Sequence, residues 1–363
     1  MQNYITEEEE IEGLGDPDSS TWGDYPIDTL LIRNDQRTIH DVLRRIKQNQ
    51  FVMDPDFQRD FIWDDAKQSK LIESVLMRIP LPVFYLAEDS QGRMVVVDGL
   101  QRLSTFRRFV NNELRLRLPD REALDRKKFD DLTPKLQNRI EDCNLILYVI
   151  DAKVPEQARL DIFERVNGGV PLTRQQMRNC LYMGEATRFL KTESGTPLFL
   201  EATGKSLRSS TMRDREFLNR FCAFQTLEIN SYRDMDEFLA ECLKRMNAET
   251  EILSGLSKQL ETTLHNNYQL FGKHAFRKHV PEQEHRNVLN ASLWDVMTTG
   301  LSRFSREIVR ANAGELKEGF YRLLRDEGFE YSITYSPNSV KQVKHRFEMV
   351  NKMLEEVFGA HSA

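Results

Sequence analysis

The stretch Val95-Val96-Val97-Asp98-Gly99-Leu100-Gln101-Arg102-Leu103-Ser104-Thr105-Phe106 decides the fold of the first half of this chain. Its three valines indicate a buried strand, Gly99 permits a tight turn, and the apolar residues that follow at helical spacing indicate a helix. A strand that passes through one glycine into a helix leaves the first backbone N–H groups of the helix without partners, at the positive end of its dipole. Such a helix start binds anions.

The side chains of this stretch also suit a phosphate. Arg102 offers a planar fork of donors, and Ser104 and Thr105 offer hydroxyl groups near the start of the helix. The alternative is a plain connection between strand and helix, in which Asp98 caps the helix and Arg102 pairs with Asp98. One glycine and one arginine do not decide between these two interpretations, so the surrounding sequence must.

The surrounding patterns predict a region of mixed helices and strands. Caps, helical spacing, β-branched runs and turn residues locate its elements. The sequence predicts a short strand at 29–32, a helix capped by Thr38, a helix from Asp64-Asp65 whose buried stripe runs to Ile79, strands at 83–87, 94–97 and 144–150, a surface excursion at 118–128, helices starting at Pro134 and Pro155, and a capping box made by Thr173 and Gln176.

Four further motifs flank the central stretch in a fixed order. They are Asp56-Phe57-Gln58-Arg59-Asp60-Phe61-Ile62-Trp63, Leu71-Ile72-Glu73-Ser74, Ile79-Pro80-Leu81-Pro82-Val83-Phe84-Tyr85-Leu86 and Phe163-Glu164-Arg165-Val166-Asn167-Gly168-Gly169-Val170-Pro171-Leu172. Over roughly residues 25–185 this set resembles the N-terminal domains of GmrSD-type modification-dependent restriction enzymes, which are related to the ParB and sulfiredoxin fold.

The resemblance implies a phosphate pocket at the central motif, used in relatives for nucleotide binding and hydrolysis. The family's typical motif there is Asp-Gly-Gln-Gln-Arg, and Leu100 replaces its first glutamine in this chain. If that glutamine holds a base or a water in relatives, hydrolysis is weakened here.

Carried over position by position, the resemblance assigns roles to individual residues. The expected catalytic residues are Asp98, Gln101, Arg102 and Glu73, and the expected phosphate- and nucleotide-binding residues are Gln58, Arg59, Gly99, Ser104, Thr105, Arg165 and Asn167. Asp98 and Glu73 are the expected ligands of a magnesium ion. For Glu73 a surface carboxylate beside Lys70 is an equally good interpretation.

Length and composition limit what the rest of the chain can do. A chain of 363 residues is expected to form two domains, here a flexible acidic tail at 1–24, a ParB-like domain at 25–184 and a helical domain at 185–363. The net charge of -6 argues against a protein that coats nucleic acid, so any contact with DNA must come from a local basic patch.

Membrane and secreted classes are not expected. The chain shows no apolar run of about 20 residues and no signal peptide, and its four widely spaced cysteines include no CxxC pair. We therefore expect a soluble cytoplasmic protein with reduced cysteines.

The C-terminal half contains two patterns that we discount. Lys278-His279-Val280-Pro281 with His285, Asn287 and Asn290 lacks the strands and ligand spacing of a His-Asn-His nuclease. Basic runs are more typical of solvated helix faces than of nucleic-acid sites; they comprise Lys205, Arg208, Arg213, Arg215 and Arg220, and Lys341, Lys344, His345 and Arg346.

The sequence therefore predicts an α+β, ParB/sulfiredoxin-like domain followed by a mainly helical domain. The expected function is a nucleotide-dependent component of DNA restriction or antiphage defence, with magnesium, ATP or GTP, DNA, and a partner nuclease or a second copy of the chain as its ligands and partners. Its chemistry would be hydrolysis of a phosphoanhydride or phosphodiester. The rival is a non-enzymatic sensor that binds nucleotide or DNA and recruits a nuclease. A sulfiredoxin-like reductase is disfavoured because no cysteine lies in the motif loop.

Overall fold

The computed structural model describes residues 11–14, 32–53, 63–89, 91–166 and 173–359. The chain divides into two compact units. The first, here called the sheet unit, comprises residues 23–181, and the second, the helical unit, combines residues 182–363 with residues 1–22. In sequence, the sheet unit is thus inserted between two parts of the helical unit.

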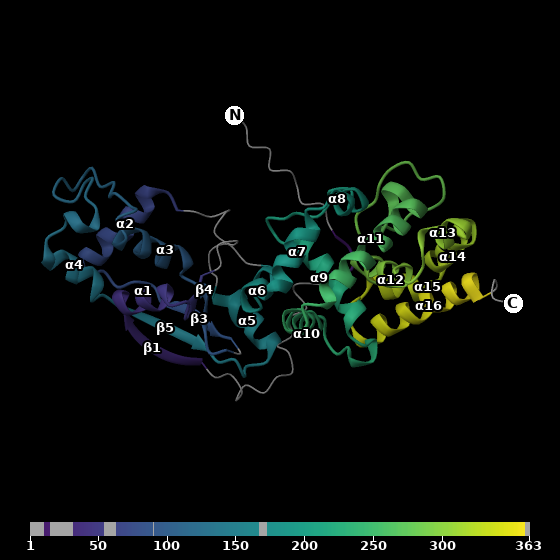
Figure 1. Ribbon diagram of the computed structural model, residues 1–363, viewed down its shortest axis with the longest axis horizontal. Coiled ribbons are helices and arrows are strands. Elements are labelled where there is room, and N and C mark those ends of the chain that lie inside the picture. Colours follow the sequence, from purple (N-terminus) through teal and green to yellow (C-terminus); the bar gives the residue numbers. More distant parts are fainter. Residues whose placement is uncertain (1–10, 15–31, 54–62, 90, 167–172, 360–363) are drawn as a thin grey trace. The chain divides into compact units, whose positions relative to one another are not determined.

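The sheet unit is built on a five-stranded mixed sheet with the strand order β1-β5-β3-β4-β2 (Figure 1). Its strands are β1 (Ile32–Thr38), β2 (Phe51–Val52), β3 (Phe84–Glu88), β4 (Met94–Asp98) and β5 (Asn144–Ile150). The pairs β1–β5 and β3–β4 are antiparallel, whereas β3–β5 and β2–β4 are parallel.

One face of this sheet carries the core of the unit. The helices α1 (Ile39–Lys47), α2 (Asp65–Leu76), α3 (Leu100–Val110) and α4 (Pro134–Glu141) share a buried apolar cluster with the strands (Figure 1). Its strand members are Phe51, Phe84, Leu86, Val96, Leu145, Leu147 and Val149, and within β3 and β5 they alternate because side chains two apart on a strand face the same way. A 3-10 turn, η3 (Phe129–Asp131), adds Phe129 to this core, and α5 (Glu156–Val166) and α6 (Arg174–Leu181) follow β5.

The predicted caps form as expected at several starts. Thr38 Oγ1 accepts from the N–H of Asp41 at 3.2 Å, and Asp64 Oδ1 accepts from the N–H of Lys67 at 2.7 Å. Thr173 and Gln176 exchange two bonds, at 2.7 and 3.2 Å, which is the predicted capping box. Each bond satisfies a backbone donor that a helix start would otherwise leave open.

Three local predictions for the sheet unit were wrong. Helix α2 ends at Leu76, Arg78 adopts a left-handed φ of 61°, and Ile79 is 47% exposed instead of buried. In the 118–128 segment, residues 119–123 are exposed as predicted, but Leu118 is 1% exposed and belongs to the core, so the predicted surface excursion is wrong at Leu118. The short strand β2 was missed, because two residues carry no periodic signal.

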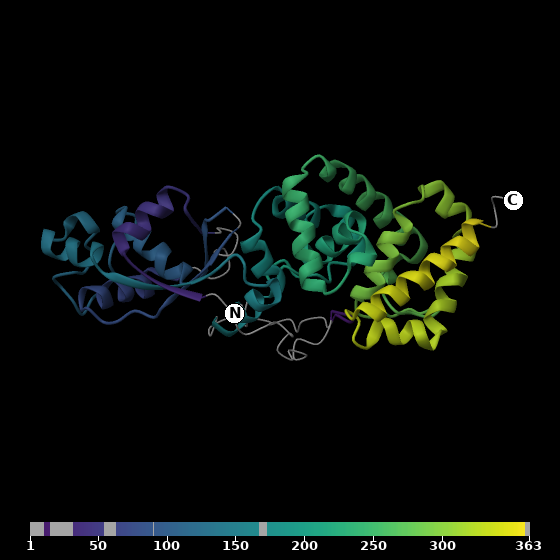
Figure 2. The same cartoon turned by 90° about the horizontal axis from the view of Figure 1, so that it is seen from below.

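The helical unit consists of helices from residue 185 onward, as predicted. They are α7 (Glu185–Ser194), α8 (Pro197–Thr203), α9 (Arg213–Thr226), α10 (Met235–Ala248), α11 (Ile252–Phe271), α12 (Ala291–Leu301), α13 (Arg306–Ala311), α14 (Ala313–Arg325), α15 (Glu327–Thr334) and α16 (Val340–Gly359) (Figures 1 and 2), with 3-10 turns η4 (Ile229–Ser231) and η5 (Gly272–His274). The mixed α/β region followed by a mainly helical region confirms the predicted fold class. None of the described helices is both long and apolar enough to cross a membrane.

Residues 11–14 form an ordered strap on the helical unit. The N–H of Glu12 donates to Leu289 O at 2.9 Å, and the N–H of Ala291 donates to Glu12 O at 2.8 Å. Glu12 also pairs with Lys278 at 3.3 Å. The prediction of a flexible tail is therefore wrong for these four residues, because acidic composition does not reveal a main-chain docking partner.

Several arginines of the basic runs are buried and structural. Arg220 and Arg346 have no exposed surface, and both pair with the buried Asp295 of α12. Arg215 is only 8% exposed. These three side chains do not form a solvated helix face, so the basic runs offer less surface charge than their sequence indicates.

Candidate phosphate site

Gly99 joins β4 to α3 in a conformation that other residues rarely adopt. Its φ is 96°, and a Cβ added there would lie 2.2 Å from Cδ1 of Phe84, whose side chain is fully buried. Both facts require glycine. The turn predicted from the sequence is therefore present, and the Phe84 ring packs against Gly99.

The start of α3 has backbone N–H groups that no carbonyl of the helix accepts. Gly99 is the N-cap and supplies no side-chain cap, and the first helical bond runs from the N–H of Leu103 to Gly99 O at 2.9 Å. Helix geometry gives the N–H groups of Leu100, Gln101 and Arg102 no carbonyl within the helix. These three donors lie at the positive end of the dipole, where an anion is stabilised.

Arg102 is bound inside the protein instead of reaching outward. Its side chain is 10% exposed, donates to the carbonyl oxygens of Pro82 and Val83, the latter at 3.1 Å, and pairs with Asp98 at 2.6 Å. Its guanidinium also lies 4.2 Å above the ring of Phe84. Burial lowers the pKa of Arg102, while Asp98 opposes that shift.

This arrangement combines parts of both sequence interpretations. The Arg102–Asp98 pair of the plain connection is present, yet Asp98 does not cap the helix. The role expected for Arg102, direct neutralisation of a phosphate, needs correction, because its fork is spent on holding the Pro82-Val83 segment against the loop. Arg102 is a positioning residue of the loop.

The neighbours of Arg102 on α3 differ in how far their side chains are exposed to solvent. Thr105 is 1% exposed and donates from Oγ1 to Gln101 O at 2.7 Å, so its predicted role in phosphate binding is wrong. Gln101 is partly exposed, and its Oε1 accepts from the N–H of Trp63 at 3.2 Å. Leu100, which replaces the family's glutamine, packs against the core, and Ser104 is partly exposed.

Glu73 belongs to a different set of contacts. Its two carboxylate oxygens pair with Lys70 and Arg121, each at 2.9 Å, and these pairs lower its pKa. Asp98 pairs with Arg102 and Glu73 with Lys70 and Arg121, so the two acids have different charge partners, and the magnesium site that they would share stays a prediction. Within the described ranges, no three His, Cys, Asp or Glu side chains are grouped so as to hold a metal.

The remaining predicted residues lie at or beyond the edge of what is described. Gln58, Arg59 and Asn167 fall outside the described residues. Arg165, in the last turn of α5, is exposed. Their roles at the pocket remain predictions.

A feature that the sequence did not reveal lies beside the loop. The β3–β4 register places Tyr85 opposite Asp98, and the β3–β5 register places Tyr148 beside Tyr85. The two tyrosine rings stack with centroids 5.6 Å apart. The alternation of Phe84, Tyr85 and Leu86 is a signal that Tyr85 faces away from the core, but the parallel pairing of β3 with β5 is not visible in the sequence.

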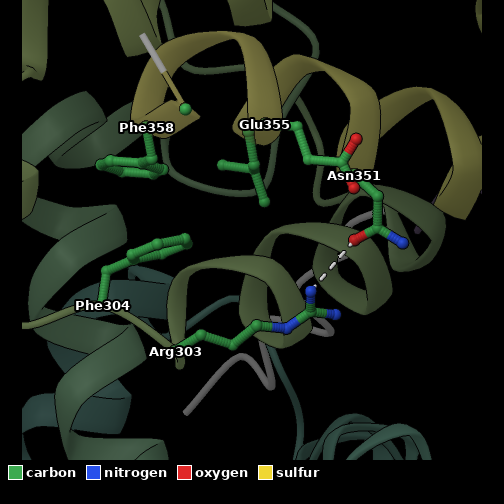
Figure 3. A pocket seen from close by; sticks show the side chains of 7 residues that line it. Arg303, Phe304, Asn351, Glu355 and Phe358 are labelled. Atoms are coloured by element: carbon green, nitrogen blue, oxygen red, sulfur yellow. Dashed lines mark hydrogen bonds between the residues drawn. The ribbon is translucent and has the colours of Figure 1, made fainter. Parts of the chain in front are cut away.

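The helical unit offers a weaker candidate. A pocket of about 300 Å³ is lined by Arg303, Phe304, Asn351, Leu354, Glu355, Phe358 and Gly359 (Figure 3). Phe304 and Phe358 stack across it at 3.8 Å, and Arg303 donates to Asn351 at 3.3 Å. Arg303 and Asn351 thus bind each other, and the stacked rings fill one side of the cavity, so it resembles packing at a helix end more than a catalytic site.

The discounted histidine patch is also structural. His279 is 6% exposed, its Nδ1 lies 2.9 Å from Arg277 O and its Nε2 lies 3.2 Å from the hydroxyl of Tyr321. Asn290 caps α12 by accepting from the N–H of Leu293. Both ring nitrogens of His279 therefore already have protein partners.

Comparison with known proteins agrees with the geometry of the sheet unit. Residues 39–183 match the family model described as GmrSD restriction endonuclease, N-terminal domain. No curated protein and no solved structure gives a significant match. The matched segment contains β2 to β5, α1 to α6 and the Gly99 loop. Residues 39–183 of this chain are thus a GmrSD restriction endonuclease N-terminal domain.

Proposed function

We propose that this domain binds a nucleoside triphosphate, with the phosphates at the N-terminus of α3, as a component of a DNA restriction or antiphage-defence system. The match to the GmrSD family supports the restriction system. The observation that carries the phosphate site is the turn at Gly99, whose φ of 96° and close approach to Phe84 leave a helix start without a side-chain cap.

Each neighbouring residue then has a defined part in binding. The N–H groups of Leu100, Gln101 and Arg102 donate to phosphate oxygens, and Arg59 and Arg165 supply the positive charge that Arg102 does not. Arg102 keeps Pro82 and Val83 against the loop. A site of this kind recognises the phosphate chain and is indifferent to which nucleotide carries it.

Hydrolysis of a phosphoanhydride or of a DNA phosphodiester is the proposed chemistry. Asp98 is 34% exposed at the end of β4, so it is the acid placed beside the bound phosphates. Asp98 and the phosphate oxygens together are the hard oxygen ligands that magnesium prefers, whereas Glu73 pairs with Lys70 and Arg121.

The second candidate function is a nucleotide or DNA sensor that recruits a separate nuclease. The specific observation in its favour is the charge pairing of the two acids, because Asp98 faces Arg102 and Glu73 faces Lys70 and Arg121. Leu100 also favours the sensor, because an apolar side chain packed on the core cannot orient a water.

Binding is tested by placing one negative charge at the loop. Gln101→Glu keeps the size of the side chain and the acceptor for Trp63, and a carboxylate in the first turn favours the helix. A bound phosphate would be repelled by about 1 to 4 kcal/mol at 4 Å, depending on the effective dielectric constant. Calorimetric affinity for ATP or GTP should fall at least about fivefold.

The matched control is Gln342→Glu, which adds the same charge in the first turn of α16 in the helical unit. Equal affinities for the wild type and Gln101→Glu would remove the loop from the site. Phosphate release from a panel of nucleoside triphosphates, beside a plasmid-nicking assay with magnesium, separates the two functions. Tight binding without turnover in either assay would establish the sensor and exclude the hydrolase.

A further inference from the structure

The second face of the sheet carries a row of side chains that ends at the Gly99 loop. In the strand register, Asn34 of β1 lies opposite Tyr148 of β5, Tyr148 lies beside Tyr85 of β3, and Tyr85 lies opposite Asp98 of β4. Directly paired residues project from the same side of a sheet, so Asn34, Tyr148 and Tyr85 share a face. The register shift between Tyr85 and Leu86 brings Asp98 to the end of this row.

This row lies at the border between a covered and an open part of the sheet. On the covered side, Ile150 and Ala87 are fully buried and Val95 is 3% exposed, although none of them belongs to the core beneath α1 to α4. On the open side, Ile146 and Gln36 are exposed. Tyr85 and Tyr148 are partly exposed between these two regions.

The geometry points to a nucleobase platform: Tyr148 and Tyr85 stack the base of the nucleotide whose phosphates lie at the Gly99 loop. This inference rests on the proposed function and adds the part of the ligand that the loop cannot recognise. The two rings already stack on each other, with an interplanar angle of 26°, so a base that stacks on the outer face of Tyr148 extends an existing aromatic stack.

The dimensions agree with a single nucleotide. Neighbouring strands are about 4.8 Å apart, so β5 lies roughly 10 Å from β4 across β3. That distance is comparable with the reach from a base to the end of a triphosphate chain, so the base lies over Tyr148 when the phosphates lie beside Asp98. Stacking on tyrosine tolerates any base, because every base has a π face.

The test compares ligands with and without a base on the full chain. ATP, GTP and inorganic tripolyphosphate are titrated calorimetrically, with the same magnesium concentration throughout, into the wild type, Tyr148→Leu and Tyr148→Phe. Because Tyr148→Leu removes the stacking of the base, its affinity for ATP and GTP should be about tenfold or more below that of the wild type. Tyr148→Phe should bind within about twofold of the wild type, since the ring is kept.

Tripolyphosphate distinguishes a lost platform from a lost fold. Its affinity should be the same for the wild type and Tyr148→Leu, which shows that the loop is intact. The matched control is Tyr331→Leu, because Tyr331 and Tyr335 form another exposed stacked pair, 5.1 Å apart, in the helical unit. This control should change no affinity.

The outcomes separate the inference from the function on which it rests. If nucleotides and tripolyphosphate bind the wild type equally well, or if Tyr148→Leu loses affinity for both alike, the platform is overturned and the phosphate site stands. If neither ligand binds the wild type, the phosphate site and the platform both fail. Nucleotide binding that is retained in Tyr148→Leu also overturns the platform.

Discussion

Gly99 is the residue on which the loop depends most directly. Alanine there must adopt a φ of 96° and place its Cβ 2.2 Å from the ring of Phe84. The left-handed conformation costs about 1–2 kcal/mol and overpacking about 1–3 kcal/mol. We expect Gly99→Ala to lower the free energy of unfolding by at least about 2 kcal/mol in urea denaturation.

A second glycine separates the two causes. Gly92 has a φ of 75°, and the nearest atom to its added Cβ is 3.9 Å away, so Gly92→Ala carries the backbone strain without the clash. Its loss should be clearly smaller than that of Gly99→Ala. An equal loss of free energy of unfolding in the two variants would show that the Phe84 side chain moves to make room for the added Cβ. The contact with Phe84 would then not be the reason why glycine is needed at position 99.

Arg102 joins the Pro82-Val83 segment to the loop through a fork of donors. Removing it leaves Asp98 and two carbonyl groups without their partner, and we expect Arg102→Ala to lose about 2–3 kcal/mol of stability. Lysine should not restore it, because a single ammonium cannot serve three acceptors in fork geometry. Thermal unfolding measures both variants.

Arg44→Ala is the control for Arg102. Its pair with Asp41 is exposed, and such pairs contribute about 0–1 kcal/mol. An Arg102→Ala protein as stable as Arg44→Ala would contradict the structural role of Arg102 and favour direct binding of phosphate by its side chain.

Glu73 gives a prediction that depends on pH. Lys70 and Arg121 lower its pKa below the ordinary value of 4.5, so its ion pairs contribute stability above that pH and lose it as the pH falls through the lowered pKa. Glu73→Gln should therefore be less stable than the wild type at pH 7, with a difference that disappears well below pH 4.5.

The measurement is urea denaturation across that pH range, with Glu122→Gln as an exposed control in the same segment. Nucleotide affinity should be unchanged in Glu73→Gln, because its carboxylate belongs to the pairs with Lys70 and Arg121. A pH-independent difference in stability, or a loss of nucleotide affinity, would contradict the separate placement of Glu73.

At the scale of elements, the strap of residues 11–14 is held by a close main-chain approach. A Cβ added to Gly13, at a φ of 76°, would lie 3.0 Å from Ser292 Oγ and 3.1 Å from Ser292 N. Gly13→Ala should loosen the strap at a cost of about 1–3 kcal/mol. Hydrogen exchange of the Ala291 amide, which donates to Glu12 O, should then become faster.

Gly272→Ala controls for the backbone, because Gly272 has a φ of 53° and no atom within 4 Å of an added Cβ. It should leave the Ala291 amide protected. Unchanged exchange at Ala291 in Gly13→Ala would show that the strap is not held by this contact.

Elements with local signals could be predicted from the sequence, and elements set by distant contacts could not. Thr38, Asp64 and the Thr173–Gln176 pair mark helix starts through bonds that span three residues, and the strand at 144–150 has its own apolar run. Ile79 and Leu118 were misplaced because their burial depends on where the chain goes next.

The same distinction applies to the candidate site. The turn at Gly99 follows from local sequence, since a strand, one glycine and a helix are contiguous. The engagement of Arg102 with Pro82 and Val83, and the stacking of Tyr85 on Tyr148, depend on strand order. Sequence reasoning therefore located the loop but assigned its arginine the wrong task.

At the scale of the whole molecule, the family match is shorter than the sheet that supports the site. It begins at residue 39, whereas β1 pairs with β5 over seven residues immediately before it. A fragment of residues 39–183 should expose the edge of β5 and associate, while a fragment of residues 25–184 should stay monodisperse. Size-exclusion chromatography with light scattering compares them, and two equally monodisperse fragments would show that β1 is dispensable.

Binding of phosphates at the start of α3 is tested by a crystal structure of the full chain with a non-hydrolysable nucleoside triphosphate and magnesium. We expect phosphate oxygens within about 3 Å of the backbone nitrogens of Leu100, Gln101 and Arg102. Phosphates held by the helical unit, with the Gly99 loop ordered and unbound in the same crystal, would contradict it.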